Sequence, residues 1–257
     1  MPLEVLRPAW GAGDGIRALA TLRGGGVSQG PFGSLNLSRS AGDDPAAVDE
    51  NRRRFADLLG ARPVWLDQVH GTRVAVLQGP DETPAAADAS VTLQPGVGCV
   101  VMVADCLPVL LCTRDGRAVG AAHAGWRGLA AGVLDNTVST LCAVAGAAPD
   151  DLMAWLGPCI GAASFEVGLD VLQAFGARPD GDRQAVDRCF VRRDRPDGSP
   201  RWLADLTALA RLRLLEAGVG QVHGGDAGCT VQQASRFFSF RRDGRTGRMA
   251  AAIAIAG

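Results

Sequence analysis

Two apolar segments joined by an Asp-Gly pair constrain the fold of this chain more than any other feature. The segments are LPVLLCT at 107–113 and AVGAAHA at 118–124, with Asp115 and Gly116 between them. Asp-Gly is a preferred pair for the two-residue turn of a β-hairpin. We therefore predict two antiparallel strands in which His123 lies opposite Pro108 and diagonal to Cys106. Because Pro108 cannot donate to a strand ladder, we expect it at a sheet edge or a bulge.

Cys106 and His123 would share one face of this hairpin as potential zinc ligands. Diagonal side chains start about 7–8 Å apart at most, a gap that long side chains can close around one ion. A third ligand must come from the three histidines, at 70, 123 and 223. His70 is the better candidate because it ends the apolar run VWLDQVH, whereas His223 falls in an expected loop. Three protein ligands and one open position are typical of catalytic zinc, although a Cys and a His on an apolar strand are also common core residues.

The remaining pattern predicts a mixed α/β (α+β) fold. A helix is expected over 39–61, with Asp44 as its cap and Pro45 in its first turn. Alternation predicts a strand over 64–78 with a break at Gly71. We also expect short strands within 3–30, strands at 97–105 and 151–161, helices at 126–146, 165–177 and 201–219, and a polar excursion at 178–201. Without an internal repeat or a convincing linker, residues 1–257 are expected to form a single domain with a mixed β-sheet core flanked by helices.

Composition excludes several kinds of chemistry. All 26 basic residues are arginine, and the chain has no tyrosine. Schiff-base catalysis and a Walker phosphate loop both need lysine, and a phenolic general acid needs tyrosine. The net charge of -1 provides no global field for nucleic acid or a membrane surface. Seven cysteines without a CxxC pair, and an N-terminus without a secretory pattern, predict a reduced cytoplasmic protein with small-molecule partners.

Several longer motifs resemble those of one known family. They are SLNLS, GDDPAAVDENR, WLDQVHG, ADASVT, ADCLPVLL, HAGWRGLAAG, GPCIG followed by SFEVG, and FFSFRRDGRTGR. Over residues 15–250 the chain is similar to the laccase-domain or YfiH-type proteins, also called polyphenol oxidases and purine nucleoside phosphorylases. The resemblance implies a single α/β domain of cysteine-hydrolase-like YfiH architecture, with zinc held by His70, Cys106 and His123. It implies phosphorolysis of adenosine, inosine, guanosine or methylthioadenosine, together with hydrolytic deamination of adenosine.

Further side chains are candidates for this chemistry. Asp105 would be a catalytic acid or base, or a carboxylate that supports the metal ligands, although the hairpin register points it away from the metal. Arginine forks and helix N-termini favour phosphate, and neutral amides can pair with a base edge or a ribose. Asp88 would brace the site or cap a turn. The expected phosphate ligands are Arg127, Arg241, Arg242 and Arg245, and the expected substrate amides are Asn36 and Gln68.

Two other functions fit the same residues. In the first, Cys106 is a thiolate nucleophile paired with His123, in an amidase or hydrolase that acts on a peptidoglycan precursor carrying misincorporated serine. In the second, the chain is a non-catalytic binding module that zinc stabilises. Copper is an alternative to zinc as a single ion, but three histidines are too few for a multicopper cluster. The oligomeric state is open between monomer and dimer.

Overall fold

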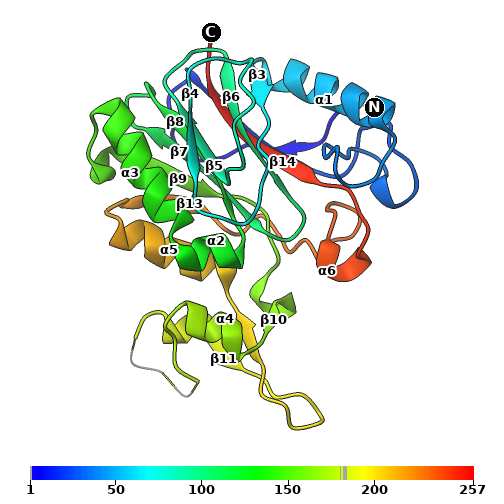
Figure 1. Cartoon of the computed structure of the whole chain (residues 1–257), viewed down its shortest axis with the longest axis vertical. Helices are drawn as coiled ribbons and strands as arrows, with labels where there is room; N and C mark the ends of the chain where they lie inside the picture. The colour runs from blue at the N-terminus through cyan, green and yellow to red at the C-terminus, as the bar shows by residue number, and fades with distance from the viewer. Residues whose placement is uncertain (1, 180, 182–183) are drawn as a thin grey trace.

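Two large β-sheets form the centre of the structure (Figure 1). The computed structural model describes residues 2–179, 181 and 184–257. The first sheet has the strand order β1 (Val5–Leu6), β2 (Ile16–Thr21), β14 (Met249–Ile255), β6 (Val97–Val103), β3 (Arg62–Val64). The second has the order β13 (Gln221–Gly224), β9 (Leu152–Leu156), β7 (Leu107–Thr113), β8 (Val119–Ala124), β5 (Ala89–Thr92), β4 (Val74–Leu77). Both sheets mix parallel and antiparallel pairs, as the mixed α/β prediction requires.

Helices cover the outer faces of the two sheets, so the fold has four layers (Figure 1). The helices are α1 (Pro45–Leu59), α2 (Trp126–Ala131), α3 (Val133–Ala145), α4 (Leu169–Ala174), α5 (Leu206–Glu216) and α6 (Phe240–Asp243). Phe55 of α1 packs with Leu19 and Ala252 on the first sheet. Leu141 and Leu214, from α3 and α5, pack on the second. The expected sheet core is therefore two packed sheets, between which residues such as Val101 and Leu110 are fully buried.

The central hairpin has the predicted register. His123 pairs with Pro108, and Cys112 pairs with Val119. The two-residue turn is not confirmed, because the Gly116 N–H donates to Thr113 O and the turn spans residues 113–116, with Gly116 at φ +73°. The expectation of an edge or bulge at Pro108 is wrong, because β7 lies inside the sheet between β8 and β9. Pro108 is tolerated there because it is the second residue of the strand, before the β9 pairing begins at Val109.

Local signals at helix ends are confirmed, whereas several longer elements are shorter than predicted. Asp44 caps α1 by accepting from the Ala46 N–H. Gly132, at φ +99°, divides the predicted helix over 126–146 into α2 and α3. The predicted strand over 64–78 is mostly a loop, with only β3 and β4 at its ends. His223 lies on β13, paired with Trp155, rather than in a loop.

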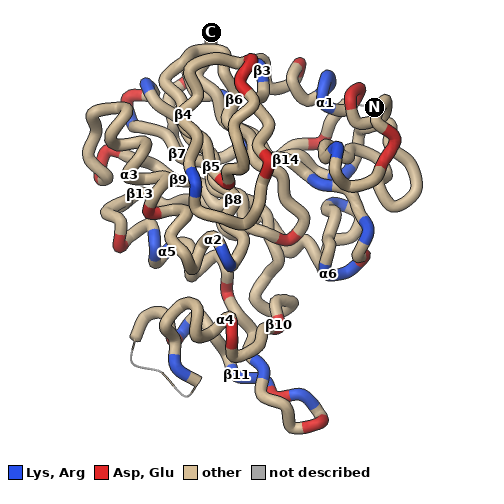
Figure 2. Tube along the Cα trace, in the orientation of Figure 1, with Lys and Arg blue, Asp and Glu red and all other residues tan. Residues whose placement is uncertain are grey.

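A small third sheet extends below the main body with α4 (Figure 1). Its strands are β10 (Glu166–Val167), β12 (Trp202–Ala204) and β11 (Phe190–Arg192). The predicted helices at 165–177 and 201–219 therefore each begin with a short strand before α4 and α5. Residues 180, 182 and 183 of the predicted polar excursion lie outside the described residues. Basic and acidic residues are both scattered over the trace (Figure 2). Within the described residues, no helix has the length and apolarity to cross a membrane.

Candidate active site

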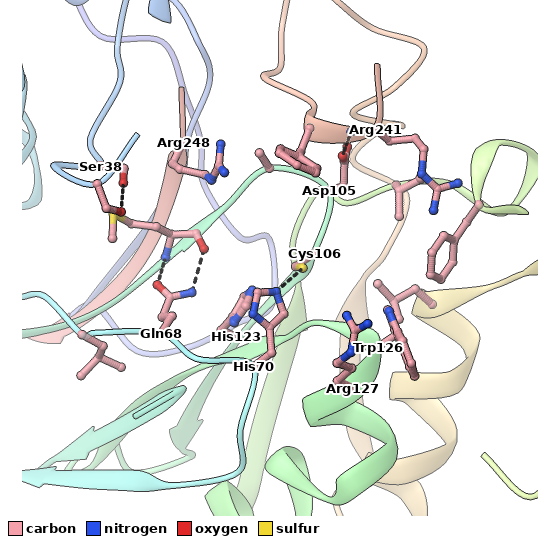
Figure 3. A pocket seen from close by; sticks show the side chains of 18 of the residues that line it. Ser38, Gln68, His70, Asp105, Cys106, His123, Trp126, Arg127, Arg241 and Arg248 are labelled. Atoms are coloured by element: carbon pink, nitrogen blue, oxygen red, sulfur yellow. Dashed lines mark hydrogen bonds between the residues drawn. The ribbon is translucent and has the colours of Figure 1, made fainter. Parts of the chain in front are cut away.

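A pocket of about 540 Å³ is lined by His70, Cys106 and His123, the three residues predicted as metal ligands. Its walls come from chain segments that are far apart in the sequence. The lining includes Ser38, Ser40, Gln68, His70, Met102, Asp105, Cys106, His123, Trp126, Arg127, Phe165, Phe240, Arg241 and Arg248. Figure 3 shows the cluster of one cysteine and two histidines at its centre. The volume is that of a small-molecule site.

The donor atoms of His70, Cys106 and His123 lie close enough to bind one ion. All three lie within 4.8 Å of one another, and Sγ of Cys106 is 3.8 Å from Nε2 of His70. Tetrahedral zinc with its usual bond lengths would place sulfur and nitrogen about 3.6 Å apart. The thiolate and imidazole donor set therefore fits zinc with small side-chain shifts. In the part of the chain that the structure describes, this is the one group of three or more His, Cys, Asp or Glu residues with such spacing.

Asp88 holds the two histidines in place. Its carboxylate is fully buried and accepts hydrogen bonds from the backbone N–H groups of Val69, His70 and Gly71, at 3.1, 2.9 and 2.7 Å. It also lies 2.8 Å from Nδ1 of His123, which leaves Nε2 of that ring for a metal. His70 has φ +60°, so its backbone is in the left-handed region that non-glycine residues seldom adopt. Asp88 thus both caps this turn and braces the site, the two roles that the sequence suggested.

The cluster is electrostatically coupled. Burial opposes ionisation of Cys106, but the charges and hydrogen bonds of His123 and His70 outweigh it and lower the pKa of the thiol to about 6. Burial also acts against the imidazolium of His123, whereas Cys106 and Asp88 stabilise it and raise its pKa to about 9. The protein without metal therefore favours a thiolate beside an imidazolium at neutral pH. A thiolate is also the form of cysteine that binds metals.

Asp105 adjoins Cys106 but its carboxylate is engaged elsewhere. It accepts from the Thr230 hydroxyl and from the Arg241 backbone N–H, both at 2.6 Å. Its φ of +91° turns the chain sharply just before Cys106. As the register predicted, the side chain points away from the ligand atoms. Asp105 lines the pocket with its carboxylate engaged by Thr230 and Arg241.

The structure divides the predicted substrate residues into two groups. Arg127, Arg241 and Gln68 line the pocket, although the amide of Gln68 is paired with both backbone groups of Met102. Asn36 is fully buried and is not in the lining.

Two of the expected phosphate arginines are also outside the pocket lining. Arg242 donates to the carbonyls of Thr230, Val231 and Phe237 and pairs with Asp243. Arg245 donates to Gly42 O. The guanidinium of Arg242 is therefore fully engaged by the protein itself, whereas Arg245 makes a single hydrogen bond at an exposed position away from the pocket. The motif FFSFRRDGRTGR contains four arginines, and their spacing alone does not show which of them reach the pocket.

Sequence reasoning missed other pocket residues. Arg248, Ser38 and Ser40 form one wall, and Trp126 and Phe165 lie on another. A further omission is the packing at Gly125, where an added Cβ would lie 3.0 Å from Sγ of Cys106 and 3.0 Å from Cδ2 of His70. The HAGWRG motif carried a signal for this glycine, because Gly125 follows His123 by two residues and glycine allows close approach of the backbone to other groups.

Comparison with known proteins identifies the family. A model of the family described as multi-copper polyphenol oxidoreductase laccase matches residues 17–256. The chain belongs to this laccase family. It is 51% identical over 249 residues to a Pseudomonas aeruginosa protein named purine nucleoside phosphorylase, covering 96% of this chain and 97% of the relative. It is 47% identical over 252 residues to the Escherichia coli K12 purine nucleoside phosphorylase YfiH, covering 97% and 98%.

The fold is shared with solved members of the laccase family. A crystal structure of a Neisseria meningitidis protein aligns with a TM-score of 0.86 and 48% identity, over 98% of this chain and 99% of that one. The family resemblance and the mixed α/β architecture expected from the sequence are thereby confirmed. The copper in the family description requires more imidazoles than this chain has for a multicopper cluster, since it contains three histidines.

Proposed function

We propose that the protein is a zinc-dependent purine nucleoside phosphorylase that also deaminates adenosine. The observation that carries the proposal is the cluster of His70, Cys106 and His123 within a pocket of small-molecule size. The names of the relatives support nucleoside phosphorolysis. The proposed substrates are adenosine, inosine, guanosine and methylthioadenosine with inorganic phosphate. All seven cysteines are free thiols, which supports the proposed cytoplasmic location.

Each side of the pocket suits a different part of a nucleoside. Trp126 and Phe165 provide apolar surface for a purine, with Arg127 stacked 4.4 Å above the Trp126 ring. His70, Cys106 and His123 would hold the zinc ion, and Asp88 would keep their orientation. When bound, zinc would supply Lewis acidity to a reacting oxygen and lower the pKa of a water molecule.

The two reactions differ in their nucleophile. In phosphorolysis an oxygen of hydrogen phosphate forms a bond to C1′, and the bond from C1′ to N9 breaks with its electron pair leaving on the purine. The proton lost by phosphate is taken by a purine nitrogen, so atoms and charge balance. In deamination a water oxygen bonds to C6, and the amino group leaves as ammonia after taking a proton from that water.

One observation favours a thiol hydrolase as the second candidate. Cys106 has its pKa lowered to about 6, and its neighbour His123 is paired with Asp88, so cysteine, histidine and aspartate are arranged as in a nucleophilic triad. This alternative needs no metal. A thiol hydrolase would turn over its substrate after chelation and would be inactivated by alkylation of Cys106.

Protein of measured metal content should be incubated with adenosine, inosine and methylthioadenosine, with and without phosphate, and the products should be separated by chromatography. We expect base release that requires phosphate and inosine formation that does not. Both should be lost on chelation and in Cys106→Ala. Cys112→Ala is the matched control, because Cys112 is a fully buried thiol outside the pocket lining. Unchanged turnover in Cys106→Ala would refute the assignment, and no turnover of any nucleoside with full metal occupancy would favour a non-catalytic zinc module.

A further inference from the structure

Arg248 is an arginine of the pocket with unused donors. Its NH1 group donates to the carbonyls of Thr246 and Gly247, at 3.0 and 3.1 Å. Among the described residues, its Nε and NH2 groups have no hydrogen-bond partner and it forms no salt bridge. Burial lowers the pKa of this guanidinium, against the opposing charges of Cys106 and Asp105. In Figure 3 the guanidinium points toward the open centre of the pocket. A partly desolvated cation with free donors favours an anionic ligand.

Two hydroxyl groups lie on the same wall as Arg248. Ser38 and Ser40 both line the pocket, and their Oγ atoms are 3.0 Å apart. Hydroxyl groups beside an arginine fork are suitable donors for the oxygens of a tetrahedral anion. Ser38 is almost fully buried, whereas Ser40 is exposed.

Asn36 ties the two parts of this wall together. Its Oδ1 accepts from the backbone N–H groups of Ser38 and Arg248, at 3.0 and 2.9 Å. Its Nδ2 donates to Ser38 O and to Asp43 Oδ2, at 3.1 and 3.0 Å. The residue expected to touch substrate instead fixes the spacing between residues 38 and 248, which are distant in sequence. Such preorganisation reduces the conformational entropy that is lost when a ligand binds.

The arginines on the opposite wall are less suited to a small anion. Arg127 is exposed and stacks on Trp126, 4.4 Å from the ring centroid. Arg241 is also exposed and donates to Glu166 O at 3.1 Å. Its distance of 5.5 Å from the Phe165 ring centroid is similar to the 5.7 Å between Arg248 and the Phe240 ring, so the difference between the two arginines is their exposure. Solvent screens exposed charges more strongly than partly buried ones. The aromatic wall therefore suits the purine, and the wall of Arg248 suits the smaller, charged reactant.

We propose that Arg248, Ser38 and Ser40 form the subsite for inorganic phosphate, with Asn36 as the positioning residue. The proposal rests on the proposed function and assigns its second substrate to a wall that the motif analysis did not select. The bound hydrogen phosphate would present one oxygen to C1′ across the pocket, while its other oxygens contact the guanidinium and the hydroxyl groups. The bond from C1′ to N9 then breaks toward the purine, which takes the phosphate proton.

Isothermal titration of inorganic phosphate into zinc-loaded protein tests the subsite directly. We expect Arg248→Gln to weaken phosphate binding at least tenfold, and Arg248→Lys to weaken it less because the charge is kept without the fork. Arg245→Gln is the matched control, since Arg245 lies nearby in sequence but outside the pocket lining, and it should bind phosphate as the wild type does. Ser40→Ala, a change at an exposed position, provides a variant with little risk to folding and should lose affinity severalfold.

Inosine phosphorolysis supplies the second readout. In Arg248→Gln the KM for phosphate should rise at least tenfold with little change in the KM for inosine. The subsite is refuted if Arg248→Gln and Arg245→Gln bind phosphate equally, if wild-type protein binds none, or if the loss occurs in Arg127→Gln or Arg241→Gln instead. Binding of adenosine monophosphate through Arg248 without binding of inorganic phosphate would also refute it. Phosphate binding that depends on Arg248 without nucleoside turnover would support the subsite and refute the proposed function.

Discussion

Asp88→Asn should damage both the stability and the metal affinity of the protein. One carboxylate oxygen accepts from the His70 N–H and pairs with His123, and the other accepts from the N–H groups of Val69 and Gly71. An asparagine keeps only one acceptor oxygen, so in either orientation of the amide two of these four donors lose their partner. At about 1.5–3 kcal/mol for each hydrogen bond to a charged group, we expect a loss of about 3–6 kcal/mol in the free energy of unfolding.

The effect on metal binding follows from the same contacts. Without the carboxylate, the His123 ring loses the partner that fixes its tautomer and orientation, a change that costs about 10–100-fold in metal affinity. Urea unfolding monitored by tryptophan fluorescence and zinc competition with a chelator measure the two effects. The control is Ser90→Ala, because Ser90 is also a fully buried polar residue and lies on β5, two residues after Asp88. The prediction is refuted if the free energy of unfolding of Asp88→Asn is within about 1 kcal/mol of that of Ser90→Ala, the size of an average point-mutation effect, and the two variants bind zinc equally well.

The same variant carries a pH signature. Burial opposes ionisation of Asp88, but hydrogen bonds from His123, Gly71 and Val69 outweigh it and lower the pKa of the carboxyl in the folded state. A depressed folded-state pKa contributes stability above the ordinary pKa of aspartate, about 3.9, and this contribution is lost as the pH falls through the folded-state value. The wild type should therefore lose more stability than Asp88→Asn when the pH is lowered from 6 to below about 3.9.

Three further predictions concern the pocket. In protein stripped of metal, alkylation of Cys106 should increase through a midpoint near pH 6, its lowered pKa, while Cys112, whose pKa burial raises to about 12, stays unmodified in a mass-spectrometric assay. Gly125→Ala should weaken zinc binding with little loss of stability, because its methyl group would contact Cys106 and His70; equal zinc affinity would contradict this packing. Asn36→Ala should cost about 2–4 kcal/mol in unfolding, from the loss of several buried hydrogen bonds, and should weaken phosphate binding, so a normal titration would exclude its positioning role.

Short-range signals predicted the parts of the fold that depend on neighbouring residues. The Asp115-Gly116 pair set the hairpin register, and Asp44 with Pro45 marked the start of α1, because turns and caps are decided within a few residues. That register, with the scarcity of histidine, was enough to select Cys106 and His123, with His70 as the better third ligand.

Features decided by distant contacts were not predictable in the same way. Apolar and polar residues alternate over 65–73 as in a strand. Three backbone N–H groups of this segment donate to the carboxylate of Asp88 instead of to a neighbouring strand, so the segment is a loop. Arg248 looked like any other arginine, since its place in the pocket depends on the buried amide of Asn36, which is more than two hundred positions away in sequence. The fold class and the cluster of His70, Cys106 and His123 were therefore predictable from sequence patterns, whereas the wall that contains Arg248 was not.

The separate origin of the pocket floor and its walls has an evolutionary consequence. The hairpin and Asp88 hold the three ligand side chains, whereas Arg248 and the serines are anchored through Asn36 on different segments. Mutations on those outer segments need not change the spacing of His70, Cys106 and His123. Descendants of one ancestor can thus inherit the same reactive centre and diverge in the molecules they accept, with each new specificity arising from a few changes at the entrance.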